Sequence, residues 1–576
     1  MKGCVYQIRK SICFLLMLAM LLSLAGCIKP LPGTEPTRNT EGSVTTSPST
    51  QPATQPTTMP AVPTEPSAVP TQPAEPEADP NALVYELTQE DVDEFYRLLQ
   101  ECETISLVGE DMDGIEASVA MVDEQYALLN AQCSIAMILH FSDTSNKQME
   151  EQYLQCVDIC ADANNEYIQM VRRIYQSDSP AKEKLFEDWS QQDIAQLLSY
   201  EEEVNLLQKR NAEIEVQYRA ATTDSVRIPL YIELVENNNR IAQIYGYDNF
   251  YTYSYDLICN RDYSAQELEQ MRRYARDYLV DTMDIALNNF INSYHSLSPS
   301  KQYNMEVLLY ADYDSLVTNY VERYINRLPE SMQEHMKTML AADSLFATSP
   351  KARAGAFTTV IGDRSYCFFG PGYAGSYTVV HEAGHYYASR YADLAAIPLD
   401  LAETHSQGNE WLFMRSLMGQ IPMDQYEAIV NYRLSNEIAM ILICLMVDEF
   451  EQRVYTTDLT GFTAADLDAI MDEVCQNYCS LEYAAEMLTD LHYYWRAVVV
   501  DQPVYYISYA VSSVASIALY TMAVEDFDGA MAVYQSLCEQ PKEEQGFLGN
   551  ITAAGLNSPF QEEFYIQFVE MINGRT

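Results

Sequence analysis

The stretch His381-Glu382-Ala-Gly-His385 is the most informative part of this sequence, because it places three metal-site groups within one short segment. Histidines four residues apart lie on one face of a helix, close enough for both imidazoles to reach one metal ion. Glu382 follows the first histidine and can accept a proton from a water that such an ion activates. The flanking residues 377–380 and 386–388 are largely apolar, which favours a buried helix over two surface histidines. We therefore expect one Zn²⁺ ion on His381 and His385, and hydrolysis of peptide bonds.

A third zinc ligand is expected from residues 400–410, which follow a loop-like stretch at 392–398. A second helix that starts near Asp400 and returns antiparallel to the first would place Glu403 beside the two histidines. Two histidines and a glutamate are a known catalytic zinc set, which favours Glu403. His405 is the competing third ligand, because imidazole suits zinc equally well, and an ordinary acidic surface helix also stays open. With Glu403 as the third ligand, His405 and Glu410 become candidates for groups that orient a ligand; Glu410 lies two turns along the same face as Glu403.

The first 26 residues have the pattern of an export signal. Basic residues at positions 2, 9 and 10 precede an apolar stretch at 12–24 that is short for a membrane span. This stretch ends in Leu24-Ala-Gly-Cys27, which resembles the lipobox of bacterial lipoproteins. We expect Cys27 to be lipidated, and the chain to be anchored to the extracellular face of the cell membrane. The alternative is an ordinary signal peptide with an incidental cysteine.

Residues 27–80 form a Pro/Thr-rich segment with 13 of the 24 prolines and no aromatic residue. Such a segment cannot bury enough apolar surface to fold, so we expect a disordered, semi-extended tether behind the lipidated cysteine. Residues 81–576 are then the folded domain, long enough for a large core. The net charge of −49, from 34 basic and 83 acidic residues, makes nucleic acid an unsuitable partner, because binding it requires basic patches.

Helical periodicity dominates the folded part, so we expect a mainly α fold. A small β-hairpin at 355–369, just before the zinc helix, is the exception. Its edge could bind a substrate peptide as an additional strand, or it could be purely structural. Ser558 and Pro559 have the pattern of a helix start, which predicts a last helix at 559–572. The long amphipathic helices are expected at 117–140, 147–175, 191–219, 227–245, 264–293, 305–327, 426–455 and 464–479.

Ten of the thirteen cysteines lie in the folded part and form no Cys-x-x-Cys pair of the kind found in zinc ribbons. Cys156 with Cys160, and Cys475 with Cys479, are four residues apart on predicted helices, a spacing that does not suit an unstrained disulfide. We expect most of these cysteines to be small buried apolar residues.

The sequence resembles the zinc peptidase family of thimet oligopeptidase and oligoendopeptidase F. The first similar block runs from Arg353-Ala-Gly-Ala-Phe357 into the zinc helix and includes Thr378, and the second contains Glu403-Thr-His405-Ser406 and Glu410. The resemblance is specific over residues 350–510 and elsewhere rests on helical character. It implies a large two-lobed helical fold with the zinc site in a deep channel, cleavage of short peptides, and Glu403 as the third ligand.

A third block, Asp501-Gln-Pro503-Val-Tyr505-Tyr506-Ile-Ser-Tyr509, is similar to the family's tyrosine-rich segment. The resemblance implies that Tyr509 donates a hydrogen bond to the oxyanion, while Tyr505 or Tyr506 holds the peptide. A phenol suits this role because it stays protonated at neutral pH. The family commonly has a histidine five residues before the proline, where this chain has Val498; the nearest histidine is His492.

Together these patterns predict a lipid-anchored, extracellular zinc oligoendopeptidase. One alternative is a peptide-binding surface lipoprotein that kept the fold and lost turnover, which Val498 favours and Glu382 opposes. Another is a zinc carboxypeptidase or dipeptidase, which needs a cationic group for the substrate's terminal carboxylate; the sequence identifies none.

Overall fold

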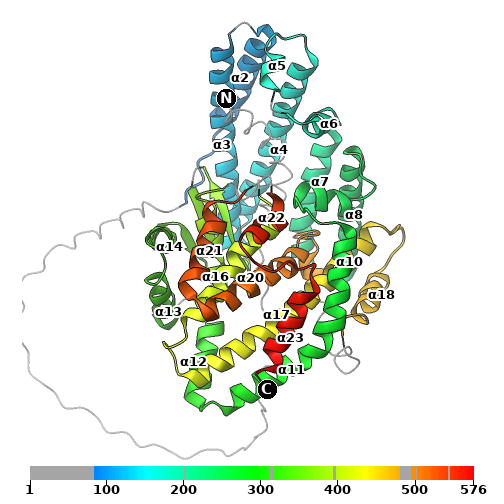
Figure 1. The fold of residues 1–576 in the computed structure, drawn as a ribbon. Helices are drawn as coiled ribbons and strands as arrows, with labels where there is room; N and C mark the ends of the chain where they lie inside the picture. The colour runs from blue at the N-terminus through cyan, green and yellow to red at the C-terminus, as the bar shows by residue number, and fades with distance from the viewer. Residues whose placement is uncertain are drawn as a thin grey trace, which may run out of the picture. The chain divides into compact units, whose positions relative to one another are not determined.

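Figure 1 shows that the described part of the chain is built mainly of helices. The computed structural model describes residues 83–575 apart from 110, 188, 200–201, 312–314, 363, 393–396, 480–491, 493–494, 501 and 543–544. Leu83–Thr576 form one compact unit. The expected export signal, Cys27 and the tether lie outside the described residues and stay predictions.

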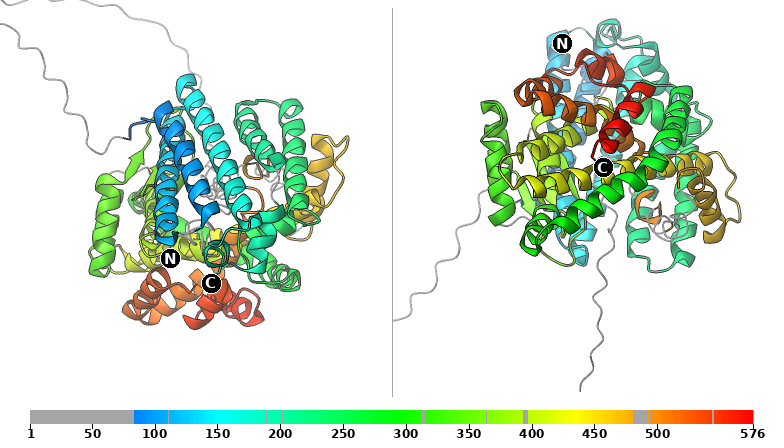
Figure 2. Two further views of the ribbon diagram at one scale, coloured as in Figure 1. Left: turned by 90° about the horizontal axis from the view of Figure 1, so that it is seen from above. Right: turned by 60° about the horizontal axis from the view of Figure 1, so that its bottom comes forward.

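The N-terminal part consists of helices, of which the first three pack side by side (Figures 1 and 2). Thr88 and Asp91 form a reciprocal capping box that starts the first of them. These helices are α2 (Gln89–Val108), α3 (Met112–Ser142), α4 (Lys147–Gln176), α5 (Lys182–Leu185), α6 (Gln191–Ser199), α7 (Glu202–Ala220) and α8 (Asp224–Ile244).

The middle of the chain contains shorter helices with two π-helical interruptions, labelled η. They are α9 (Phe250–Tyr253), η1 (Ser254–Ile258), α10 (Ala265–Tyr274), η2 (Ala275–Leu279), α11 (Val280–Ser296), α12 (Pro299–Tyr310), α13 (Ser315–Ile325) and α14 (Glu330–Ala342).

A small sheet precedes the C-terminal helices. Strands β1 (Ser344–Phe346), β2 (Ala356–Ile361) and β3 (Arg364–Phe369) have the order β1-β3-β2. The β2–β3 pair is the expected hairpin and is antiparallel, whereas β1 pairs with β3 in parallel. This order places β2 at an edge of the sheet, and β2 also packs against the helix that follows.

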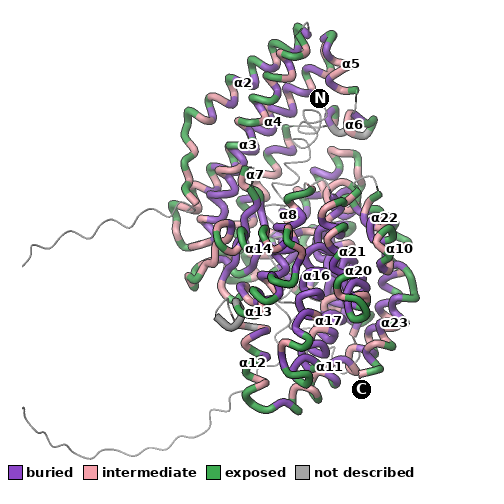
Figure 3. Tube along the Cα trace, turned by 60° about the vertical axis from the view of Figure 1, so that its left-hand side comes forward, coloured by how far each residue is buried: buried purple, intermediate pink, exposed green. Residues whose placement is uncertain are grey.

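The remaining helices contain the most deeply buried part of the protein, which is purple in Figure 3. In α16 and α20 almost every residue is buried, and α16 packs against both α15 and α20. The helices are α15 (Ser376–Ala388), α16 (Leu399–Ser416), α17 (Met423–Tyr455), α18 (Ala464–Cys475), α20 (Ile507–Glu525), α21 (Phe527–Glu539), α22 (Gly546–Ala553) and α23 (Glu562–Asn573).

Two described helices, α17 and α20, are long and apolar enough to span a membrane. In each, 83% of the most apolar window is buried inside the protein. Their hydrophobicity is therefore used in the core, where they pack against each other.

The expected mainly α fold with a hairpin before the histidine helix α15 is confirmed, but several predicted boundaries are wrong. The helix predicted at 264–293 is interrupted by η2, and those at 191–219 and 305–327 are each two helices. The last helix begins at Glu562 rather than Pro559, because the Ser558 hydroxyl accepts a hydrogen bond from the Phe560 N–H and closes a turn. The strand β1 had no recognisable pattern over its three residues.

Candidate metal centre

Helices α15 and α16 approach each other closely enough to bring the predicted ligands together. Gly384 makes this possible, because a Cβ at this position would lie only 2.4 Å from the His405 carbonyl oxygen. The Asn409 side-chain amide donates to the Val380 carbonyl at 2.7 Å and fixes the two helices in register.

His381, His385 and Glu403 meet at this helix crossing. One ligand atom from each lies within 4.8 Å of the other two. Glu403 Oε2 is 3.6 Å from His381 Nε2 and 3.7 Å from His385 Nε2. Glu403 is buried, and each histidine is at most about one-eighth exposed. Two imidazole nitrogens and one carboxylate oxygen at these separations match the donor set of a catalytic zinc site.

Glu410 occupies the orienting position expected from its spacing. Its Oε1 accepts a hydrogen bond from His381 Nδ1 at 2.7 Å, while Oε2 pairs with Arg433 at 2.8 Å. This bond holds the His381 ring so that Nε2 points at Glu403. Arg433 also contacts Glu437, at 3.3 Å. Arg433 could not be identified as a partner of Glu410 from the sequence, because it lies on α17, far beyond the motif in the chain.

The electrostatics of the site favour a cation. Burial opposes charge on His381, but its hydrogen bond to Glu410 and the charges of Glu410, Glu382 and Glu403 raise its pKa to about 9. Burial raises the pKa of Glu403 to about 7 against the influence of His381 and Tyr505. Burial and the neighbouring His381 lower the pKa of His385 well below its usual range. The carboxylates of Glu410, Glu382 and Glu403 therefore stabilise positive charge at His381, whereas burial keeps His385 neutral and able to act as a metal ligand.

Glu382 lies on the same helix and is held by the sheet. The Thr358 hydroxyl of β2 donates to Glu382 Oε2 at 2.7 Å, and Glu382 is buried. The predicted hairpin therefore reaches the site through a side chain that sequence reasoning did not single out. A fixed carboxylate next to the ligand positions is suited to proton transfer.

His405 does not face the site. Its Nε2 contacts the Leu537 carbonyl of α21 at 3.1 Å, and its Nδ1 has no hydrogen-bond partner in the described part of the chain. The expectation that His405 is a ligand or orients one is therefore wrong. On a helix it lies about 200° around from Glu403, so both cannot point the same way.

The tyrosine segment lies against the predicted ligands, where Tyr505 makes a contact that the sequence analysis did not anticipate. The Tyr505 hydroxyl donates to Glu403 Oε1, so this tyrosine contacts the predicted third ligand. Rings of Tyr506 and Tyr509 pack on Tyr505 and on each other, with centroids 5.4–6.3 Å apart. All three phenols are buried and cluster beside Glu403. Tyr505 is thereby placed as a residue that orients a ligand.

The backbone at Val504, just before the tyrosine cluster, is strained and is held in place by two side chains. Val504 has φ of 61°, a left-handed conformation that is unfavourable for a β-branched residue. Its N–H donates to Glu451 at 2.8 Å, and its carbonyl accepts from Arg261 at 2.9 Å. These two buried partners hold the turn that carries Tyr505 to the ligand.

His492 does not replace the histidine that Val498 displaces. Its Nε2 contacts Asp472 at 2.5 Å, and Nδ1 lies 3.8 Å from Asp468. Asp468 is also paired with Arg496 at 2.6 Å, so His492 belongs to a separate charged cluster. Val498 itself is buried.

Solved structures with the same arrangement of helices are peptidases by description. The PZ peptidase A complex with an inhibitor aligns with a TM-score of 0.64 at 17% identity, over 85% of this chain and 98% of that one. The chain has the fold of the oligoendopeptidase F structures. A Bacillus anthracis protein assigned as oligoendopeptidase F aligns at 0.62 and 16% identity, over 85% and 96% of the two chains.

The structure of oligoendopeptidase F from Enterococcus faecium also aligns with this chain. The TM-score is 0.51 at 13% identity, over 85% of this chain and 98% of that one. No protein-family model matches this sequence, and no protein of curated function does either. The likeness therefore lies in the fold, and the activity is to be argued from the site.

Proposed function

We propose that this protein is a zinc-dependent oligoendopeptidase that hydrolyses peptide bonds in short peptides. The observation that supports this most is the convergence of His381, His385 and Glu403 within 4.8 Å, beside a buried Glu382, in a chain with the oligoendopeptidase fold.

The donor set and its electrostatics fit one Zn²⁺ ion. Bound zinc would polarise the scissile carbonyl and lower the pKa of a water to about 7. His381, His385 and Glu403 would hold the ion, and Glu410 keeps His381 oriented. Within this frame Glu382 accepts the proton of the attacking water and returns it to the leaving amine, with Thr358 fixing its carboxylate.

The remaining groups bind and stabilise the substrate. Strand β2 lies at the sheet edge and bonds to Glu382 through Thr358, so a peptide added along this edge would run beside the ligands. Tyr509 packs against Tyr505, which contacts Glu403, and we assign Tyr509 the role of donor to the oxyanion.

Peptide turnover separates this proposal from its rivals. We would incubate the zinc-loaded full chain and its Glu382→Gln variant with a broad mixture of short peptides and identify products by mass spectrometry. Internal cleavage by the parent alone is the expected result. Removal of single C-terminal residues or of dipeptides would indicate an exopeptidase instead. Zinc binding without cleavage by either protein would overturn the peptidase proposal in favour of a peptide-binding protein.

We further propose that the chain is a bacterial lipoprotein anchored through Cys27 at the outer face of the cell membrane. The apolar stretch at 12–24 followed by Leu24-Ala-Gly-Cys27 supports this. The expected result is incorporation of a fatty-acid probe by the parent and its loss in Cys27→Ala. Equal labelling of the two proteins, or none in the parent, would contradict the anchor.

A further inference from the structure

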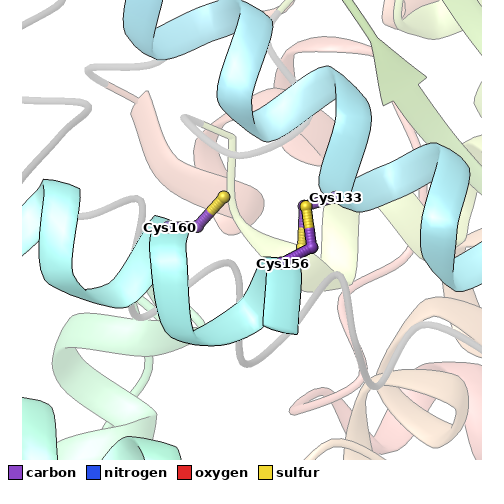
Figure 4. A group of neighbouring side chains, drawn as sticks. All are labelled: Cys133, Cys156 and Cys160. Carbon is purple, nitrogen blue, oxygen red and sulfur yellow. The ribbon is translucent and has the colours of Figure 1, made fainter. Parts of the chain in front are cut away.

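A second group of potential metal ligands lies in the N-terminal helices, away from the histidines. Cys133 of α3 and Cys156 and Cys160 of α4 bring their three sulfur atoms within 4.8 Å of one another (Figure 4). All three side chains are at most 1% exposed. Two ligands four residues apart on one helix, completed by a third from its neighbour, is the same arrangement as in the histidine site.

The helices that carry these cysteines are held in a fixed register. The Tyr126 hydroxyl of α3 donates to Asn164 of α4 at 3.0 Å, one turn beyond Cys160. The Cys160 thiol also contacts the Leu129 carbonyl across the same interface, at 3.5 Å. The three thiols therefore converge because of the helix packing.

Tyr85 adds an oxygen beside the sulfur atoms. Its hydroxyl hydrogen-bonds to Cys156, and its electrostatic neighbours include Cys133 and Cys160. The segment that carries Tyr85 lies along α3, because the Glu86 N–H donates to Gln132 Oε1 at 2.8 Å. This half-buried phenol is placed where a fourth ligand, or a donor to a thiolate, would be needed.

We propose that Cys133, Cys156 and Cys160 form a second metal site, which takes one thiophilic divalent ion of the zinc class. Sulfur atoms bound to one Zn²⁺ at about 2.3 Å are about 3.8–4 Å apart, so small side-chain rotations complete the site. The ion replaces three thiol protons, which pass to solvent, and the site then has a net charge of −1. The Tyr85 hydroxyl stabilises that charge as ligand or donor. The role of the bound ion is structural, because it joins α3, α4 and the segment before α2.

Thiolate ligands distinguish this site from the histidine site spectroscopically. Co²⁺ bound by thiolates has intense ligand-to-metal charge-transfer absorption in the near ultraviolet, whereas Co²⁺ on two histidines and a glutamate has none. We would titrate Co²⁺ into the reduced, metal-free full chain under anaerobic conditions. The expected result is a charge-transfer band that saturates at one equivalent, with two ions bound per chain in total.

Cysteine variants test whether the charge-transfer band comes from these three thiolates. Cys133→Ser, Cys156→Ser and Cys160→Ser should each abolish it and lower the bound metal from two ions to one, with the helical circular dichroism retained. Cys102→Ser is the matched control, because Cys102 is equally buried in the adjacent helix α2 but lies outside the cluster. It should keep the band.

Three results would overturn the site. They are Co²⁺ binding without a charge-transfer band, a band that survives all three substitutions, or a Cys133–Cys156 disulfide in protein purified without reductant. The disulfide is the competing chemistry for two thiols on neighbouring helices, and peptide mapping detects it. None of these readouts depends on peptidase activity.

Discussion

Gly384 lies directly against the backbone of His405: a methyl group on its Cα would be 2.4 Å from the His405 carbonyl oxygen and 2.7 Å from Ser406 Cα. Both atoms belong to the backbone of α16, which cannot move without displacing Glu403. The spacing between the two ligand helices therefore depends on a glycine at this position.

We expect Gly384→Ala to destabilise the protein by at least about 2 kcal/mol, because the added methyl forces the two helices apart. Gly408→Ala is the control, since its methyl would meet mainly side-chain atoms of Leu519 at 3.1 Å and Tyr534 at 3.4 Å. Both changes gain the same intrinsic helix propensity. Denaturant unfolding of the two variants measures the difference, and equal stabilities would show that the helix contact is looser than described.

Glu410→Gln should weaken zinc binding about 10–100-fold, because the carboxylate that orients His381 and pairs with Arg433 is lost. Competition with a chromophoric chelator measures the affinity. Glu437→Gln is matched to it, since Glu437 also contacts Arg433 but is not bonded to the histidine. A Glu437 variant that loses as much affinity would indicate that the effect comes from Arg433 alone.

The Tyr505→Phe and Tyr509→Phe substitutions should affect different properties, the first zinc affinity and the second kcat. Removing the Tyr505 hydroxyl frees Glu403 Oε1, so zinc affinity should fall severalfold. Removing the Tyr509 hydroxyl should leave zinc affinity unchanged and lower kcat by about 10²–10³, the effect of deleting one oxyanion donor. Kinetics at saturating zinc, together with chelator competition, separate the two. The reverse pattern would exchange the roles of these tyrosines.

His140 should make the fold sensitive to acid. Burial lowers the pKa of His140 to about 4, below the unfolded value of about 6.5. The unfolded chain thus binds more protons between these values, and stability falls as the pH decreases through this window. His140→Phe keeps the ring contact with Tyr153 and removes the titration.

From pH 7 to pH 5, the wild type should lose up to about 2 kcal/mol more stability than His140→Phe. Urea unfolding at the two values measures this. The exposed His295 supplies the control: His295→Phe should lose as much stability as the wild type. An unchanged acid sensitivity in His140→Phe would show that His140 is already charged in the folded protein.

The candidate site was predictable where it depends on local geometry. Helical periodicity alone places His381 beside His385, and Glu410 two turns beyond Glu403, and the structure keeps both relationships. The direction of the His405 side chain follows from its helical angle of about 200° from Glu403, which residue type alone does not show. The fold class followed from periodicity, whereas the π-helical segment at Ala275–Leu279 was not predicted.

Contacts between distant segments were not predictable from one sequence. Thr358, Arg433 and Arg261 reach the site from a strand, a later helix and a loop, and nothing in their local sequence marks them. The tyrosine segment was found only through its resemblance to a family. Even then, the hydrogen bond from the Tyr505 hydroxyl to Glu403 depends on the strained turn at Val504, which the resemblance does not show.

Arg261 connects the turn that carries Tyr505 to the start of α16. Its guanidinium donates to the Val504 carbonyl and to Ser508, both at 2.9 Å, and lies 3.7 Å from Asp400 at the start of α16, with the charged pair fully enclosed. Moving the turn at Val504 away from Asp400 and α16 would leave a buried charge without its partner, which is costly. We therefore expect these segments to move together. If the proposed site opens to admit a peptide, we expect the hinge to lie outside the contacts between Arg261, the Val504–Ser508 segment and Asp400.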